Sequence, residues 1–201
     1  MAPQIFLGAA KAFADLGYEA TRVEDILAAS RVSRRTFYKL FRSKEAVFEA
    51  LFAYGGAAVD SAMVMATAQA GSERSRRIEA AVAALFESLD DFGPVCAAML
   101  IEARKPESHF APLRERVFRR FEQLLQAELQ AAAIETDLLL VRALIAAVED
   151  IAINLLRQSP RGQLDHARAQ AVVLRLITAS LLAPASSVVH RLPRPYAPEH
   201  G

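Results

Sequence analysis

The stretch Ser30-Arg31-Val32-Ser33-Arg34-Arg35-Thr36-Phe37-Tyr38-Lys39-Leu40-Phe41 decides how this 201-residue chain is interpreted. It joins a short helical pattern that ends near Ala29 to another over residues 34–41, through a four-residue turn at 30–33. Two short helices joined by so short a turn are typical of a helix-turn-helix. Thr21 and Glu24 form a capping-box pattern at the start of the first helix, and Ser33 is placed to cap the second.

Positive charge is concentrated in the same stretch. Arg31 to Lys44 contains six basic side chains and no acidic one, although the whole chain has 24 Lys and Arg against 23 Asp and Glu. A basic run alone is usually a solvated helix face, but on the second helix of a helix-turn-helix it suits phosphates and guanine edges. At 100° per residue the helix has an anchoring apolar face formed by Phe37, Leu40 and Phe41. The opposite face is basic and aromatic, with Arg35, Tyr38, Lys39 and Arg42.

The rest of the chain is predicted to be helical as well. Alanine is abundant and no strand-length alternation occurs, so we expect an all-α fold of about nine helices. The first helix is expected to end at Gly17 in a left-handed cap. A fourth follows Ser43, and the Gly55-Gly56 pair is expected to kink or end it. Further helices are expected over residues 75–91, 95–104, 112–133, 137–157 and 164–182.

Three segments are predicted from this pattern. Residues 1–52 are expected to form a helix-turn-helix DNA-binding domain of three helices and the start of a fourth. Residues 53–183 are expected to form a larger helical bundle that binds an effector and dimerises. Residues 184–201 are Pro-rich, and we expect them to be a disordered tail.

Composition and missing motifs exclude several classes of protein. The apolar fraction of 53% and the charged fraction of 23% suit a soluble globular protein. Cys96 is the single cysteine and has no Cys or His neighbours at metal-ligand spacing, so we expect no disulfide, metal or cofactor. An all-α enzyme is disfavoured, because no phosphate-binding glycine loop or HExxH motif is present. No targeting signal or uninterrupted apolar run of about 18 residues occurs, so a cytoplasmic location without a membrane partner is expected.

Several spacings taken together resemble the N-terminal domain of the TetR/AcrR family of bacterial transcriptional regulators. The resemblance covers about residues 5–52. It rests on Phe6-Leu7-Gly8-Ala9-Ala10, Phe13, Gly17-Tyr18, Thr21-x-Val23-x-x-Ile26, Val32 to Phe41 and Lys44-Glu45. It implies an all-helical homodimer, usually a repressor, that leaves a palindromic operator when a small molecule enters the C-terminal domain. Arg31 stands where the family commonly has a turn glycine, so a non-glycine residue is expected to adopt a positive φ.

The resemblance also implies which residues contact DNA. They match Thr21, Ser33, Arg34, Arg35, Thr36, Tyr38, Lys39 and Lys44, to which the basic face adds Arg42. Those expected to hold phosphates are Thr21, Tyr38 and Lys44, and those better suited to base edges are Arg34, Arg35, Thr36 and Lys39. The alternative is a helical protein-interaction module that no longer binds DNA, for which a neutral or acidic third helix would be typical.

The larger bundle suggests a pocket for an apolar or aromatic effector. Aromatic and polarisable residues crowd its central helices, where they either line such a pocket or simply fill the core. The pocket candidates are Phe86, Leu89, Phe92, Cys96, Met99, Leu100, Phe118, Phe121 and Leu125. Glu102, Arg104 and His109 are polar groups that either orient the effector or have only surface and capping roles.

A dimer interface is predicted on the last two helices. The helix over residues 137–157 has a wide face free of charged groups, and the last helix is rich in small residues. This combination suits an intermolecular four-helix interface, although burial inside one protomer explains it as well. The interface candidates are Leu144, Val148, Ile151, Leu155, Val173, Ile177 and Leu181.

Overall fold

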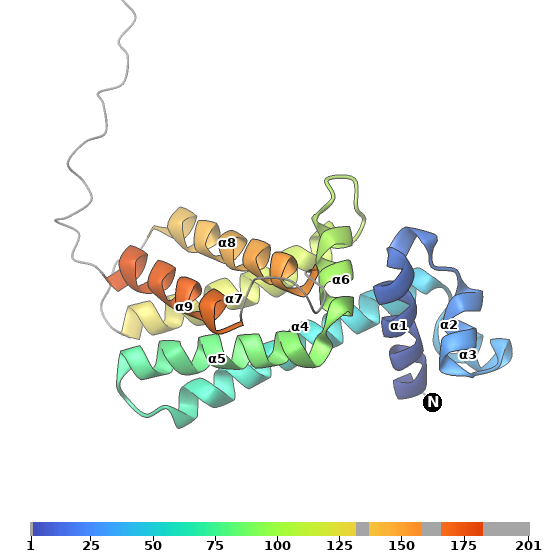
Figure 1. Ribbon diagram of the computed structural model, residues 1–201, viewed down its shortest axis with the longest axis horizontal. Coiled ribbons are helices and arrows are strands. Elements are labelled where there is room, and N and C mark those ends of the chain that lie inside the picture. Colours follow the sequence, from blue (N-terminus) through green and yellow to red (C-terminus); the bar gives the residue numbers. More distant parts are fainter. Residues whose placement is uncertain (1, 132–136, 158–165, 183–201) are drawn as a thin grey trace, which may run out of the picture.

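The fold of the chain is all-α, as the sequence predicts (Figure 1). A computed structural model describes residues 2–131, 137–157 and 166–182, and within these ranges it contains nine α-helices and no strand. They are α1 (Ala2–Ala20), α2 (Val23–Ser30), α3 (Arg34–Leu40), α4 (Lys44–Gln69), α5 (Arg74–Phe92), α6 (Pro94–Arg104), α7 (Ala111–Ala131), α8 (Leu138–Arg157) and α9 (His166–Ile177), with a π-helical turn over Thr178–Leu182. The predicted tail over 184–201 lies outside the described residues.

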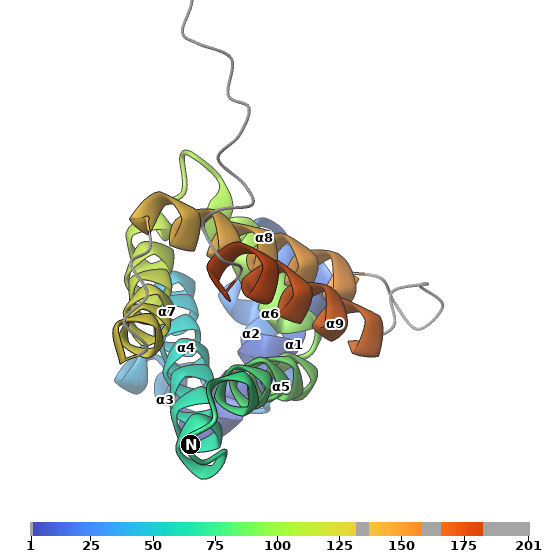
Figure 2. The same ribbon diagram turned by 90° about the vertical axis from the view of Figure 1, so that its left-hand side faces the viewer.

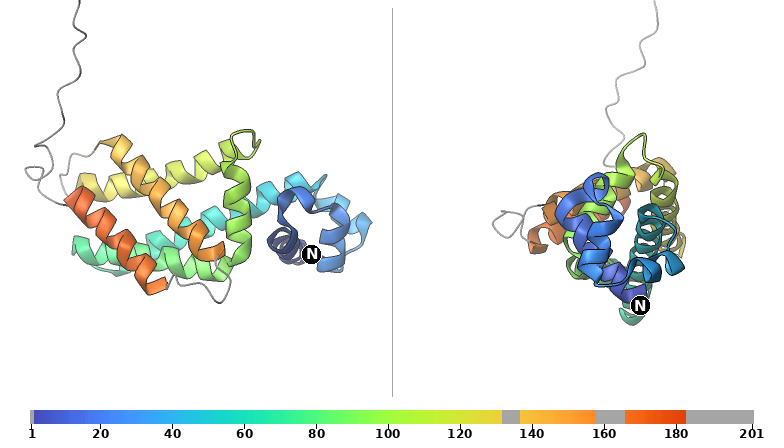
Figure 3. Two further views of the ribbon diagram at one scale, coloured as in Figure 1. Left: turned by 45° about the horizontal axis from the view of Figure 1, so that its top comes forward. Right: turned by 90° about the vertical axis from the view of Figure 1, so that its right-hand side faces the viewer.

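Helices α1 to α3 form a small unit at one end of the molecule (Figures 1 and 3). Its centre is fully buried and contains Ile5, Phe13, Ile26, Phe37 and Phe48. The same apolar cluster continues into α6, which contacts α1. The unit is therefore anchored both by the start of α4 and by the side of α6.

Helix α4 runs without interruption from this unit into the larger bundle (Figure 1). The predicted kink or end at Gly55-Gly56 does not occur, and the predicted boundary between residues 52 and 53 falls inside the helix. A Cβ atom at Gly56 would lie 2.8 Å from Cγ2 of Val117, so glycine lets α7 approach α4 closely. By length and composition α4 could also cross a membrane, and in this fold it packs against α5 and α7.

Helices α5 and α7 pack on α4, and α8 and α9 complete the bundle on the far side of α5 and α7 (Figure 2). A second apolar cluster joins them, with Val82, Leu129, Val141 and Val173 buried at its centre. Helix α6 lies between this bundle and α1, and it contacts both α1 and α8 (Figure 1). The bundle therefore meets the N-terminal unit through α4 and α6.

Candidate DNA-binding surface and effector cavity

Helix α2 begins one residue later than the sequence predicts. Arg22 is its N-cap, and the Arg22 backbone N–H donates to Oδ2 of Asp25 at 2.8 Å. Thr21 is only 1% exposed, and its hydroxyl donates to the carbonyls of Ala12 at 3.2 Å and Gly17 at 2.6 Å. Thr21 therefore ties α1 to α2 instead of capping α2. Its predicted phosphate contact needs revision, because the hydroxyl proton is already used inside the protein.

The turn between α2 and α3 has the conformation that the sequence predicts. Arg31 adopts the left-handed conformation at φ 54° and ψ 29°, so a non-glycine residue does occupy the positive-φ position. Ser33 caps α3 by accepting a hydrogen bond from the Thr36 backbone N–H at 3.1 Å. The hydroxyls of Ser33 and Thr36 also lie 2.9 Å apart in a hydrogen bond. These two side chains fix the start of α3.

Only part of the predicted anchoring face of α3 is buried. Phe37 is fully buried, and the half-buried Phe41 packs on Phe6 with ring centroids 5.8 Å apart. Leu40 is 47% exposed, so the prediction that it anchors the helix is wrong. Helix α3 ends at Leu40 and the backbone of Phe41 is already extended, so Phe41 reaches Phe6 from outside the helix. A helical angle of 100° per residue does not apply across that end.

The outward side of α2 and α3 is a surface of unpaired cations. We call Arg31, Arg35, Tyr38, Lys39 and Arg42 the basic face. Its four cations are exposed, and they have no hydrogen-bond or ion-pair partner within the ranges that the structure describes. Tyr38 is 49% exposed and rests edge-on against the Phe37 ring. Because unpaired surface cations attract phosphate and exchange counterions on binding, this face suits a nucleic-acid backbone.

Arg34 differs from the other cations of α3, because it is paired within the protein. Its guanidinium donates to the carboxylate of Glu24 on α2, and both side chains are exposed. The pKa of Glu24 lies below its usual range, owing first to a hydrogen bond from its own backbone N–H and then to Arg34. A base contact by Arg34 would therefore have to compete with Glu24, whereas Arg35 is free.

Lys44 lies at the junction of α1 and α4. Its ammonium donates to the carbonyls of Tyr18 at 2.9 Å, Glu19 at 3.2 Å and Thr21 at 2.9 Å. It also lies 4.4 Å from the centroid of the Tyr18 ring. Cations stabilise helix C-termini, and here one ammonium satisfies three carbonyls at the end of α1. In this arrangement Lys44 positions the N-terminal unit of α1 to α3. The phosphate contact predicted for Lys44 would have to be made in addition to these three bonds.

Replacing Lys44 or Lys39 with methionine separates these two roles. We expect Lys44→Met to cost about 1–3 kcal/mol of stability, because three hydrogen bonds to a charged donor are lost. Its effect on the salt dependence of DNA binding should be small. Lys39→Met, at an exposed and unpaired position, should leave the melting temperature unchanged and reduce the salt slope by about one. Thermal melts and DNA titrations at several salt concentrations measure both, and a reduced slope for Lys44→Met would assign it a phosphate.

An aromatic cluster joins the N-terminal unit to the bundle. The Phe110 ring stacks on Phe48 at 4.1 Å and meets Tyr18 edge-on at 4.9 Å, while His109 lies 3.9 Å from Phe110. Tyr18 also donates to Oε1 of Glu45 at 3.0 Å. Burial, followed by that hydrogen bond, raises the pKa of Tyr18 well above its usual range. His109 therefore belongs to the junction and not to the wall of a pocket.

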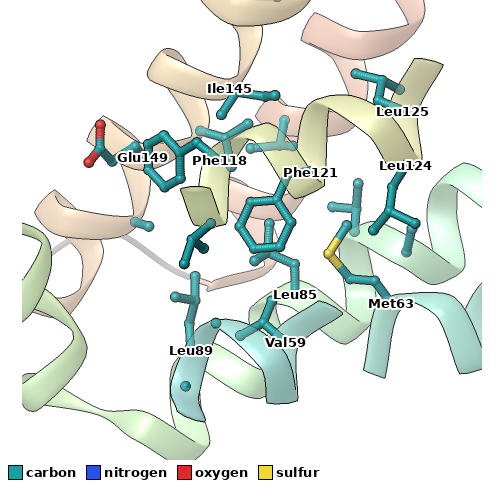
Figure 4. Close-up of a pocket in the computed structure, with 18 of the residues that line it drawn as sticks. Val59, Met63, Leu85, Leu89, Phe118, Phe121, Leu124, Leu125, Ile145 and Glu149 are labelled. Carbon is teal, nitrogen blue, oxygen red and sulfur yellow. The ribbon is translucent and has the colours of Figure 1, made fainter. Parts of the chain in front are cut away.

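A cavity of about 440 Å³ lies within the bundle, among α4, α5, α6, α7, α8 and α9 (Figure 4). Eight of the nine predicted pocket residues line it: Leu89, Phe92, Cys96, Met99, Leu100, Phe118, Phe121 and Leu125. Phe86 does not, because it is buried in the core with its ring edge-on to His166. Glu102 and Arg104 do not line it either, since they pair with Lys105 and Asp150. Burial raises the pKa of the Cys96 thiol to about 12.

Sequence reasoning missed the contribution of α4 and α8 to this cavity. Val59 and Met63 of α4 and Ile145 of α8 line it (Figure 4). Helix α4 is apolar on most of its sides, so its periodicity does not distinguish a side that faces a cavity from one that packs on a neighbour. The single signal available was its length of 26 residues, which carries it from the reading unit past the cavity.

Four polar side chains among the described residues reach the cavity wall, namely Thr67, Arg77, Glu128 and Glu149. Arg77 of α5 binds Glu128 of α7 in a two-pronged ion pair, with Nε to Oε2 at 2.8 Å and Nη2 to Oε1 at 2.5 Å. Arg77 thereby lowers the pKa of Glu128. Glu149 of α8 is paired with Arg114 of α7, with Nε to Oε1 at 2.6 Å. Each ion pair therefore bridges α7 to a neighbouring helix at the wall.

The predicted dimer-interface residues point into the protomer. Five of them are buried in the bundle core: Leu144, Leu155, Val173, Ile177 and Leu181. Val148 and Ile151 are partly buried and pack against the same cluster. The fold thus places these side chains against the core of the protomer, and their part in a dimer interface stays a prediction. The outward sides of α8 and α9 instead expose Leu139, Ala143, Ala146, Ala171 and Val172.

Comparisons with known proteins agree with this architecture. The model of the family "Bacterial regulatory proteins, tetR family" matches residues 5–51. The fatty acid degradation regulator FadR from Bacillus halodurans has the same fold, with a TM-score of 0.76 at 20% identity over 88% of this chain and 98% of its own. FadR from Bacillus subtilis, solved with stearoyl-CoA, has a TM-score of 0.76 at 17% identity over 90% and 100%. PfmR from Thermus thermophilus, a TetR-family regulator, has a TM-score of 0.63 at 23% identity, over 86% of this chain and 96% of its own. Curated protein sequences give no match.

The fold joins a helix-turn-helix unit to a larger helical bundle that contains a cavity. Residues 5–51 match the tetR family model, and the chain shares its overall fold with solved structures described as TetR-family regulators.

Proposed function

We propose that the protein is a cytoplasmic, homodimeric repressor that binds a palindromic operator and releases it when an apolar small molecule occupies the cavity. One observation carries this proposal. The same helix, α4, begins at the unit that holds the basic face and lines the cavity with Leu51, Phe52 and Val59. A surface suited to DNA and a cavity suited to a ligand therefore share one structural element.

A homodimer follows from the need to read a palindrome. One basic face covers a single half-site, and a twofold axis presents two copies in the orientation that a palindrome requires. The outward sides of α8 and α9 support such a contact, since they expose Leu139 and Val172 together with several alanines. Small side chains at that surface would let two helix pairs approach closely and form a four-helix interface.

The effector we propose is predominantly apolar. The cavity volume lies within the usual range for small-molecule sites, and its lining is apolar except for four side chains. The stearoyl-CoA complex of the Bacillus subtilis neighbour supports a ligand with an extended apolar part for this fold. Because Phe48 packs in the reading unit one turn from Leu51 and Phe52 in the cavity wall, a ligand that favours another position of α4 would also move α3.

Selection of bound sequences from a random DNA pool tests the DNA half of the proposal. The expected result is a palindromic consensus whose affinity falls steeply with salt. Absence of any selected sequence would favour the protein-interaction module over the repressor. Sedimentation of the protein on the selected DNA then gives the number of protomers bound per operator, for which we expect two.

A further inference from the structure

Glu149 is a buried carboxylate in the wall of an otherwise apolar cavity. Its side chain is 1% exposed, and it lines the cavity from α8. It lies beside the ring of Phe118, on the opposite side of the cavity from Met63 and Leu125 (Figure 4). A ligand that fills the cavity would therefore contact apolar side chains at one side and meet this carboxylate at the other.

Arg114 donates two hydrogen bonds to the Glu149 carboxylate, which leaves some of its acceptor sites vacant. Nε and Nη2 of Arg114 donate to one carboxylate oxygen each, with the Nε bond at 2.6 Å. A carboxylate has about four acceptor sites, so each oxygen can accept again. Arg114 does not itself line the cavity, and its guanidinium carbon lies 4.4 Å from the Phe118 ring centroid. The charged group closest to a ligand at this side is therefore the negative member of the pair.

The described part of the cavity wall offers no free cation to an anionic ligand. Arg77 is the lining cation, and two of its nitrogens donate to Glu128. Its third nitrogen donates to the carbonyls of Thr67 at 3.2 Å and Gly71 at 3.3 Å. Four of the five guanidinium donors are thus already used. A carboxylate or phosphate inside the cavity would have to break these bonds and would still face Glu149.

We infer that the effector carries a positively charged, hydrogen-bond-donating head on an apolar body, an amine in chemical class, and that Glu149 accepts this head. The inference rests on the proposed function and specifies its ligand. A buried ion pair adds little stability over apolar residues of similar size, so stability alone does not explain a carboxylate in this wall. An ammonium donor would fill the vacant acceptor sites of Glu149, whereas an anion would be repelled at short range in a medium of low dielectric constant.

Three probes with one body and different heads test the inference on the full-length protein. Phenylbutylamine, phenylbutanol and phenylbutanoate share the same apolar part and differ in charge near neutral pH. Calorimetric titration should show the amine binding at least about tenfold more tightly than the carboxylate, with the alcohol between them, as expected for a hydrogen bond to a charged group. The amine should also weaken binding of the protein to its selected operator.

Glu149→Gln supplies the matched variant. It keeps the shape of the side chain, removes its charge and leaves the guanidinium of Arg114 without a counter-ion. The preference for the amine over the carboxylate should therefore be lost, because the charge that distinguishes the two heads is gone. Glu122→Gln is the control, because Glu122 also lies on the bundle in an ion pair, accepting from Arg142 Nε at 2.9 Å, but does not line the cavity. It should keep the wild-type order.

Each outcome decides one claim. Tighter or equal binding of the carboxylate to the wild-type protein overturns the inference and leaves the cavity as an effector site. Loss of the amine preference with Glu122→Gln as well overturns the assignment to Glu149. If none of the three probes binds, the effector cavity of the proposed function fails and the inference fails with it. The wild-type series needs no variant, so it decides the matter even if Glu149→Gln does not fold.

Discussion

Replacing Gly8 with alanine is expected to disrupt the DNA-reading unit more than any single change on its surface. A Cβ atom at this position would lie 2.5 Å from Cβ of Ser30 and 2.6 Å from its backbone nitrogen. Ser30 is the last residue of α2, so the added methyl group pushes α1 away from the start of the turn. Overpacking of this kind costs about 1–3 kcal/mol, and here the obstacle is backbone as well as side chain. The melting temperature and the operator affinity should both fall.

Gly55→Ala is the matched control for this change. A Cβ atom there would meet the Phe92 ring at 3.8 Å, which is ordinary van der Waals contact. Because Gly55 lies inside α4, alanine should instead stabilise the helix by up to about 1 kcal/mol. If Gly8→Ala keeps wild-type stability and operator affinity, the close approach of α1 to Ser30 is not needed for folding of the reading unit.

Replacing Arg35 with alanine is expected to weaken operator binding and to relax sequence preference. Arg35 is exposed and unpaired in the described structure, so it is free to donate two hydrogen bonds to a guanine edge. Loss of such a contact costs about 1–3 kcal/mol, or roughly five- to 150-fold in affinity. Titrations against the selected operator and against single-base variants of it measure both effects.

Arg116→Ala controls for the loss of one positive charge. Arg116 is exposed on α7, away from the basic face, and its removal should leave operator affinity within about twofold since only screened long-range attraction changes. Equal weakening of every sequence by Arg35→Ala would reassign Arg35 to phosphate contact. Wild-type binding by Arg35→Ala would remove it from the DNA interface altogether.

Features set by local sequence could be predicted well. Ser33 caps α3 as expected and Arg31 takes the positive φ of the turn, whereas Gly17, at φ 77° and ψ 165°, interrupts α1 without ending it in a left-handed cap. These features depend on neighbours within a few residues, and turn and cap chemistry is specific at that range. The all-α class and the order of the helices follow from the same kind of signal.

Features that depend on partners far along the chain could not be predicted. Thr21 and Lys44 have polar groups suited to a phosphate, but in the fold they meet carbonyls of α1 up to 26 residues away. Glu149 pairs with Arg114, 35 residues earlier, and nothing in the local pattern marks it as part of a cavity. Periodicity identifies an apolar side of a helix but does not name the element that covers it.

The burial of Leu144 and Leu155 shows the same limit on α8. Both lie on the wide apolar side that the sequence reveals, and an interface or a core explains that side equally well. Only the positions of α5, α7 and α9 show that Leu144 and Leu155 are buried within the protomer. The exposed strip on α8 and α9 is narrower and richer in alanine, so it gives a weak signal in the sequence.

The unbroken helix α4 acts as a lever. Its 26 residues extend about 39 Å at the ordinary rise of an α-helix. A rigid arm of that length turns a tilt of about 5° into a displacement of roughly 3 Å at its far end, since the displacement scales with the helix length. In the proposed dimer two such arms move at once, so a small adjustment around the cavity changes the span between the two basic faces by up to twice that amount. The pair Gly55-Gly56 does not interrupt α4. A movement at the cavity would therefore be transmitted along one continuous helix to the basic face.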